Sequence, residues 1–151
     1  MARQPKQIHI FLYRLTETGY EYAIFQRADM LECWQGVCGG LEDEETLEEG
    51  ARRELFEEAG IRERLPLYQL ESISYIPAGI FLEEDQKRWG TDTVVIPMYY
   101  YAMPADREIT LSEEHCCVEW LGYEDAMKRL YFETQRTALY ELNQRLIRKS
   151  L

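Results

Sequence analysis

Three glutamates, Glu54, Glu57 and Glu58, are spaced at i, i+3 and i+4 in a segment that predicts a helix over residues 46–59. Because a helix turns by about 100° per residue, their carboxylates converge on one patch at the edge of the apolar stripe. Crowded carboxylates repel each other, and partial burial increases the repulsion. A hard divalent cation such as Mg²⁺ or Mn²⁺, which prefers oxygen ligands, would offset it. The spacing therefore favours a divalent-metal site.

Gly50 lies one turn before Glu54, where it costs about 1 kcal/mol of helix propensity relative to alanine. Its missing side chain is expected to leave room for a metal or a phosphate. The alternative, from helix spacing alone, is a solvated acidic face whose ionic partners are Arg52 and Arg53.

A longer pattern around this segment decides between the two interpretations. Its fixed positions are Gly39, Glu45, Arg53, Glu54, Leu55, Glu57, Glu58, Gly60 and Ile61. The spacing resembles the Nudix box, G-x5-E-x7-R-E-U-x-E-E-x-G-U with U aliphatic, and every fixed position is filled. The resemblance implies hydrolysis of a nucleoside diphosphate linked to another group, with divalent metal ions, on a mixed sheet between helices.

The resemblance also implies a role for each charged residue of the box. Glu57 and Glu58 would be metal ligands, and Glu54 would be a further ligand or the base that activates the attacking water. Arg53 would orient the glutamates through ion pairs, and its expected partner is Glu45.

The glycine-rich segment before the helix is expected to lie close to ligands. The Gly39 carbonyl would be another metal ligand, because glycine lets the backbone approach a metal or phosphate closely. Two local features depart from many family members: Val37-Cys38 replaces Pro-Gly, and Glu44 stands where glycine is common. Neither departure removes a ligand, but both are expected to alter the loop.

Shorter segments resemble dihydroneopterin triphosphate pyrophosphatases, also described as dATP pyrophosphohydrolases. These segments are W-Q-G-V-C-G-G, F-Q-R-A-D, and L-S-E-E-H followed by E-W-L. The resemblance implies substrate contacts from Arg27, Trp34, Gln35 and Gly40, and a role for Glu114 as a remote metal ligand or base. His115 is expected to be structural or solvated.

Aromatic side chains that could stack on a base or pterin ring are Trp34, Tyr75, Phe81, Trp89 and Tyr99. Two positions resemble markers of other subfamilies. Pro77 resembles the proline marker of the ADP-ribose group, and Tyr75 the tyrosine marker of the dinucleoside polyphosphate group. The two markers indicate different substrates.

Hydrophobic periodicity predicts the elements that position these residues. Strands are expected over 7–15, 20–26, 67–76, 91–103 and 118–121, with the first two forming a hairpin. Helices are expected over 46–59, 123–130 and 133–148, and loops over 27–33 and 77–90. The fold class is therefore α/β of the α+β type, with a mixed sheet sandwiched between helices.

Composition limits the choice of function. The 151 residues are expected to form one domain, 1–151, with a net charge of −11. This charge argues against a nucleic-acid coat and against binding to an anionic membrane, so cations must mediate contact with an anionic substrate. A signal sequence and an apolar run long enough to span a bilayer are both missing, which favours a cytoplasmic location. A monomer and a homodimer both stay open.

The leading hypothesis is a pyrophosphohydrolase that cleaves a nucleoside triphosphate, or a related deoxynucleoside or pterin triphosphate, to monophosphate plus pyrophosphate. The alternative is hydrolysis of dinucleoside polyphosphates or nucleotide sugars. A nucleotide-binding module without catalysis is the third possibility, although such modules typically lose box glutamates.

Overall fold

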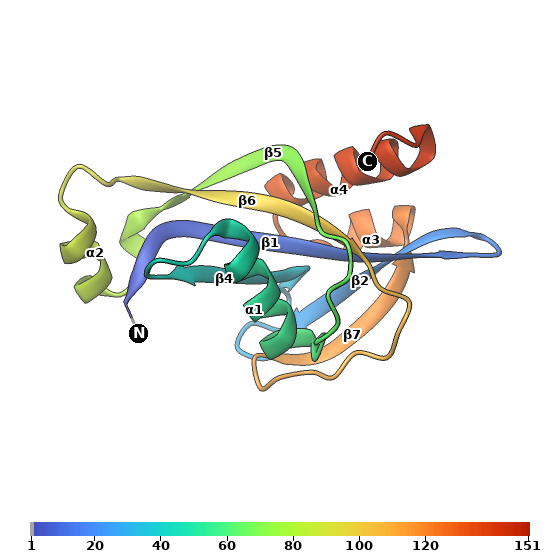
Figure 1. Cartoon of the computed structure of the whole chain (residues 1–151), viewed down its shortest axis with the longest axis horizontal. Coiled ribbons are helices and arrows are strands. Elements are labelled where there is room, and N and C mark those ends of the chain that lie inside the picture. The colour runs from blue at the N-terminus through green and yellow to red at the C-terminus, as the bar shows by residue number, and fades with distance from the viewer. Residues whose placement is uncertain (1) are drawn as a thin grey trace.

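The computed structural model describes residues 2–151 and contains a seven-stranded mixed sheet flanked by helices (Figure 1). The strands are β1 (Arg3–Thr16), β2 (Gly19–Arg27), β3 (Trp34–Gln35), β4 (Val37–Glu42), β5 (Tyr68–Pro77), β6 (Val95–Pro104) and β7 (His115–Gly122). The helices are α1 (Leu47–Ala59), α2 (Glu83–Trp89), α3 (Tyr123–Arg129) and α4 (Glu133–Arg148), with a 3₁₀ turn η1 (Ala78–Ile80). This architecture confirms the predicted fold class.

Strand β1 lies at the centre of the sheet, and two different strands pair with successive parts of the same edge. Its residues 12–16 pair antiparallel with β2, whereas residues 3–10 pair antiparallel with β4. Its other edge pairs with β6 in parallel. Beyond β1, strand β2 continues to pair with β3 and β7. The end of β2 and strand β4 are thereby brought to the same side of β1.

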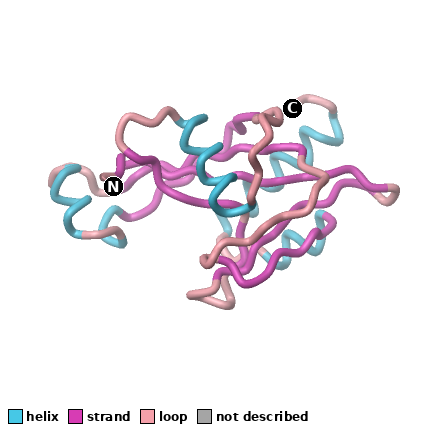
Figure 2. Tube along the Cα trace, turned by 60° about the horizontal axis from the view of Figure 1, so that its bottom comes forward, coloured by secondary structure: helices cyan, strands magenta, loops and turns pink. Residues whose placement is uncertain are grey.

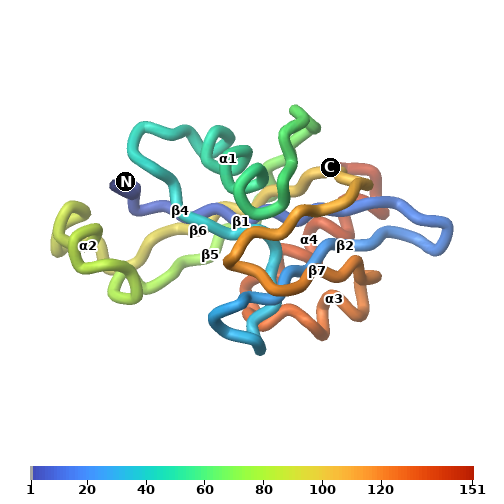
Figure 3. The backbone as a smooth tube through the Cα atoms, turned by 90° about the horizontal axis from the view of Figure 1, so that it is seen from below, coloured from blue at the N-terminus to red at the C-terminus, as the bar shows by residue number. Residues whose placement is uncertain are grey.

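The sheet separates two apolar cores. Alternation along β1 places Ile8, Ile10 and Leu12 in the core under α1, and Phe11 and Tyr13 in the core under α3 and α4. Figures 1 and 3 show α1 on the opposite side of the sheet from α3 and α4. Both faces of β1 are therefore buried.

Helix α1 begins and ends as its sequence predicts. The Thr46 hydroxyl accepts from the Glu49 N–H at 3.1 Å, and the Glu49 carboxylate accepts from the Thr46 N–H at 2.9 Å, which completes a capping box. Gly60 ends the helix at φ 72°, a conformation that glycine adopts without strain. Figure 2 shows the loop before β7 passing beside this end of α1, and the Thr110 N–H donates to the Ala59 carbonyl at 3.1 Å.

The prediction of a loop over 77–90 was wrong, because η1 and α2 lie there. Helix α2 has only seven residues, too few for a clear apolar period. Its order of charges suits the helix dipole, with three acidic residues in the first turn and Lys87 and Arg88 in the last. Among the helices of residues 2–151, none has the length and apolar character needed to cross a bilayer.

Candidate active site

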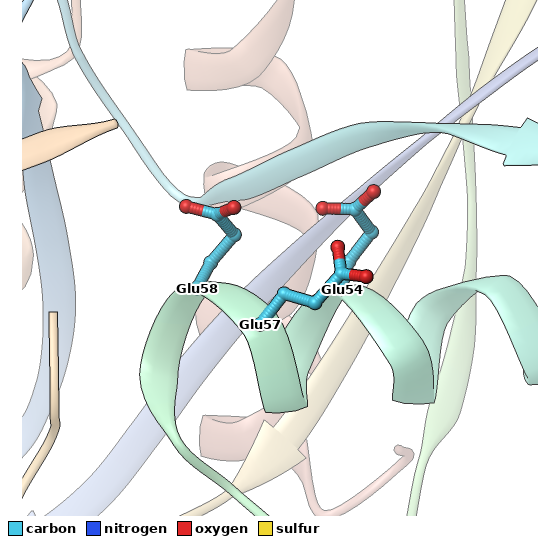
Figure 4. A group of neighbouring side chains, drawn as sticks. All are labelled: Glu54, Glu57 and Glu58. Carbon is cyan, nitrogen blue, oxygen red and sulfur yellow. The ribbon is translucent and has the colours of Figure 1, made fainter. Parts of the chain in front are cut away.

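The predicted carboxylate cluster forms on α1. Glu54, Glu57 and Glu58 each offer an oxygen, and the three oxygens lie within 4.8 Å of one another. Figure 4 shows the three side chains pointing from α1 toward the same side. Glu54 and Glu58 are buried, whereas Glu57 is exposed. Oxygen-only donors of this kind suit Mg²⁺ or Mn²⁺.

Glu54 lies directly beneath the glycine segment of β4. A Cβ atom on Gly39 would come within 2.3 Å of the Glu54 carboxyl carbon, so a larger residue there would have to displace the Glu54 carboxylate. Burial raises the pKa of Glu54 to about 7, although a hydrogen bond from Arg53 opposes the rise. Such a carboxylate can take up and release a proton near neutral pH.

Arg53 connects the cluster to β4 and to the loop before α1. It forms the expected ion pair with Glu45, at 2.6 Å from Nε and 3.0 Å from Nη2. Its Nη1 donates to Glu54 at 2.9 Å and to Glu57 at 3.2 Å. Its Nη2 also donates to the Gly40 carbonyl at 2.9 Å. One guanidinium therefore orients two of the three clustered carboxylates.

Gly40 was predicted to bind substrate, but its carbonyl accepts from Arg53 and from Arg3, the latter at 3.2 Å. In this arrangement Gly40 supports Arg53. Glu42, which sequence reasoning missed, also lies 3.1 Å from the Arg53 guanidinium. Its place after the glycine pair carries no periodic signal that would have indicated this contact.

The loop before β7 reaches Glu58 from the other side. The Ser112 hydroxyl donates to Glu58 in a short hydrogen bond, and the His115 Nδ1 lies 3.3 Å from the same carboxylate oxygen. Burial, followed by the charge of Glu58 and a hydrogen bond with it, raises the pKa of Glu114. Glu114 therefore lies near Glu58, and its role as a remote ligand or base stays a prediction. Burial lowers the pKa of His115, which favours its neutral form.

Sequence reasoning did not single out Ser112, and it favoured a structural or solvated place for His115. The structure buries His115 against Glu58. Both contacts depend on a loop path that sequence spacing does not define.

A cavity of about 510 Å³ opens beside the cluster. Its walls come from β1, the end of β2, β3, β4 and the loop before β7, with Gly39 and Glu114 among the lining residues. Arg27 lines the cavity and is paired with Asp29 at 2.6 Å. Cys38 also lines it, and burial raises the pKa of its thiol to about 12, so the thiol stays neutral.

A second cavity of about 520 Å³ adjoins the first on the α4 side of the sheet. Arg27, Gln35 and Cys38 line both cavities, as does Gln7. The walls of the second cavity are largely apolar, and they include Tyr75, Ile76, Pro77, Phe81, Met98 and Phe132. Two of the predicted stacking aromatics, Tyr75 and Phe81, therefore lie at this cavity.

Trp34 lies away from both cavities. It packs against the core under α3 and α4, and the Arg129 guanidinium lies 4.5 Å from its ring centroid. Of the other aromatic candidates, Trp89 packs edge-on against Phe81, and Tyr99 packs against the core under α1. Trp34 is close to the glycine segment in sequence, but its side chain lies against Arg129 of α3 and lines neither cavity.

The structure also bears on the expectations about Gly50 in the helix and Glu44 in the loop before it. The predicted room at Gly50 was wrong, since a Cβ there would lie 2.1 Å from Leu41, and the glycine instead lets α1 pack closely on β4. Glu44 has φ 70°, the left-handed region that favours glycine, which explains why a glycine is the easier residue at that position.

The fold and the site together define a NUDIX hydrolase. A family model described as the NUDIX domain matches residues 5–142, and the chain belongs to this family. It is therefore a hydrolase of phosphoanhydrides, a pyrophosphohydrolase in a family whose typical substrates are nucleotide polyphosphates and which typically depends on divalent metals.

Three relatives place the chain within the family. It is 29% identical over 148 residues to the pig (Sus scrofa) asymmetrical bis(5'-nucleosyl)-tetraphosphatase, covering 95% of each sequence. A Listeria monocytogenes protein assigned as a NUDIX hydrolase is 35% identical, with a TM-score of 0.86 over 97% of each chain. The E. coli dihydroneopterin triphosphate pyrophosphohydrolase is 22% identical, with a TM-score of 0.74 over 95% of this chain and 97% of that one.

Proposed function

We propose that this chain cleaves a nucleoside triphosphate, or a related deoxynucleoside or pterin triphosphate, to a monophosphate and pyrophosphate. The observation that carries the proposal is the carboxylate cluster of α1, with Glu54 beneath Gly39, beside a cavity that Gly39 lines and that adjoins a largely apolar pocket. This arrangement suits a ligand with a polyanionic end and a flat apolar end.

The proposed ligands for Mg²⁺ or Mn²⁺ are Glu54, Glu57, Glu58, the Gly39 carbonyl and Glu114. The bound cation would neutralise phosphate charge and make an attacking water more acidic. Arg53 holds Glu54 and Glu57 in place. Glu54, whose pKa is about 7, would accept a proton from the water if it is not fully engaged as a ligand, and Glu114 is the other candidate base.

The position of each side chain suggests which of the proposed substrate-binding residues act directly and which act indirectly. Arg27 and Gln35 line both cavities and are proposed to contact the substrate directly. Trp34 and Gly40 are proposed to act indirectly, by supporting the sheet beside the cavity and the Arg53 guanidinium. Residues 1–151 are proposed to act as one domain, as a monomer or a homodimer.

Asymmetrical cleavage of a dinucleoside tetraphosphate is the second candidate. The relative from pig, which covers nearly the whole chain, favours it. The products separate the two reactions: pyrophosphate and a monophosphate indicate a triphosphate substrate, whereas two nucleotides of unequal phosphate length indicate a dinucleotide.

The test is turnover of a substrate panel with Mg²⁺ or Mn²⁺, with products identified by phosphorus NMR. The panel contains canonical, oxidised and pterin triphosphates, dinucleoside polyphosphates and nucleotide sugars. A chelator should abolish turnover, and added Mg²⁺ should restore it. Glu57→Gln and Glu58→Gln should each lower kcat by about 100-fold or more, whereas Glu124→Gln, on the exposed surface of α3, should not. Full activity of both box variants would refute the assigned site.

A further inference from the structure

Three buried glutamines share the second cavity. Gln7, Gln35 and Gln135 are 9%, 7% and 3% exposed, and all three line its wall. Within residues 2–151, none of their amide nitrogens donates a hydrogen bond to the protein. These nitrogens are not fully enclosed by protein, so they are open to the cavity and can donate to whatever occupies it. Three such donors on one cavity wall point to a ligand that accepts hydrogen bonds.

His9 determines how the Gln135 amide is turned. The buried His9 Nε2 accepts from the Gly36 N–H at 3.0 Å, so the neutral ring carries its proton on Nδ1. Burial keeps the ring neutral by lowering its pKa to about 3, and the neighbouring Gln135 side chain opposes this shift. The His9 Nδ1 and the Gln135 Oε1 are both fully buried, and neither forms a hydrogen bond of normal geometry in the described chain. Because one is a donor and the other an acceptor, the Gln135 oxygen is the end of the amide that suits the His9 side, which leaves its NH₂ group for the cavity.

Gln35 is arranged in a similar way. Its Oε1 accepts from the Cys33 thiol at 3.7 Å, which leaves its NH₂ group unpaired at the cavity wall. Apolar side chains such as Ile76 and Met98 form the surrounding surface. The cavity thus combines an apolar surface for a flat ring with two sets of N–H donors.

We propose that this cavity binds the heterocyclic base of the substrate, and that Gln135 selects bases whose edge presents hydrogen-bond acceptors. A 6-oxopurine offers two adjacent acceptors, N7 and O6, on one edge. Adenine offers an acceptor beside an amino donor on the same edge, which would set donor against donor at an amide NH₂ group. His9 acts as a positioning residue, since it touches Gln135 and lies in the core.

This inference rests on the proposed function, because it takes the phosphates to lie at the carboxylate cluster. The two cavities share Arg27, Gln35 and Cys38, so a nucleotide with its base in the second cavity directs its phosphates toward the first. Because Gln35 lies on the wall that the two cavities share, its amide can contact the base and also lie beside the phosphates.

The test compares binding of inosine 5'-monophosphate, adenosine 5'-monophosphate and ribose 5-phosphate by calorimetry. We expect the inosine nucleotide to bind about tenfold more tightly than the adenosine nucleotide. Gln135→Leu should remove this preference and leave the affinity for ribose 5-phosphate unchanged, and His9→Phe should do the same. Gln144→Leu, the same change on the same helix but outside the cavity, should retain the preference.

A second measurement keeps the proposal falsifiable if the His9 or Gln135 variants fail to fold. In the wild-type protein, the inosine nucleotide should shift the side-chain amide NMR signal of Gln135, which lines only the second cavity, and ribose 5-phosphate should not. Equal affinity for the two bases, an undiminished preference in Gln135→Leu, or unmoved amide signals would overturn the proposal. Base selection without anhydride hydrolysis would refute only the proposed reaction, whereas hydrolysis without base selection would refute only this inference.

Discussion

At the scale of single residues, the site depends on one positively charged side chain, that of Arg53, which lies among carboxylates. Arg53 contacts Glu45, Glu54 and Glu57 with a planar group that donates in several directions at once. A lysine ammonium keeps the charge but cannot form the two-pronged contact with Glu45. The shape of the guanidinium therefore matters as much as its charge.

Arg53→Lys is expected to lower kcat by about 10- to 100-fold, because residues that orient ligands commonly have effects of this size. Steady-state kinetics at saturating Mg²⁺ measures the change. Arg52→Lys is the matched control, since Arg52 pairs with the exposed side of Glu48. Similar activity in both variants would show that charge alone suffices.

Gly39→Ala is expected to lower kcat by about 100-fold, because the new methyl group would displace the Glu54 carboxylate and small misplacements of catalytic groups have effects of this order. The control is Gly122→Ala, where a Cβ meets nothing within 4 Å. Kinetics and thermal unfolding of both variants separate a local displacement from a general loss of stability. Unchanged kcat in a folded Gly39→Ala protein would contradict the packing described for Glu54.

At the scale of elements, α1 presents its carboxylates only if its first turn is held in register. The capping box at Thr46 and Glu49 supplies partners for backbone groups that a helix start leaves unpaired. Packing of Gly50 against Leu41 then sets the helix close to β4, which carries Gly39 over Glu54.

Thr46→Ala is expected to lower the free energy of unfolding by about 1 kcal/mol, since the side-chain cap is lost. Denaturant unfolding measures the change. Glu49→Gln keeps an acceptor for the Thr46 N–H and should cost less. A larger loss in Glu49→Gln than in Thr46→Ala would indicate that charge at the helix start outweighs the cap.

At the scale of the whole molecule, one carboxylate ties α4 to the edge strand β5. Glu141 accepts from the Ser72 hydroxyl at 2.7 Å, from the backbone N–H groups of Glu71 and Ser72, and from Arg145 at 2.8 Å. Burial alone would raise the pKa of Glu141, but these hydrogen bonds outweigh it and the pKa is lowered.

Because the folded-state pKa of Glu141 lies below its ordinary value of 4.5, its contribution to stability is complete above that value. The contribution is lost as the pH falls through the lowered pKa. Glu141→Gln is expected to cost about 1–2 kcal/mol at pH 7, after allowance for solvent screening, and much less at pH 3. Denaturant unfolding at both pH values measures the difference. An equal cost at both would show that the charge of Glu141 contributes nothing.

Local sequence patterns predicted much of this structure because the responsible forces act over a few residues. Helix periodicity brought Glu54, Glu57 and Glu58 to one face, and the capping box marked where α1 begins. Alternation along β1, a property of any strand, divides its side chains between the two cores. The charged residues of the box could also be predicted, because their spacing is itself the signal.

Other features depend on which segments meet, and that is decided by tertiary packing. The contacts of Ser112 and His115 with Glu58 need the path of a loop more than 50 residues away along the chain. Trp34 adjoins the glycine segment in sequence, but the sheet turns it toward Arg129. Neither outcome leaves a periodic trace in the sequence.

The sequence by itself determined the carboxylate cluster, because all three carboxylates lie on one helix whose geometry is local. Only the tertiary structure decided what surrounds that chemistry. Strand β1 pairs with β2 and β4 along the same edge, and residues of all three strands line both cavities. Gln135 and His9 are neighbours although they are 126 positions apart in the sequence. Long-range contacts of this kind follow from the packing of the whole sheet.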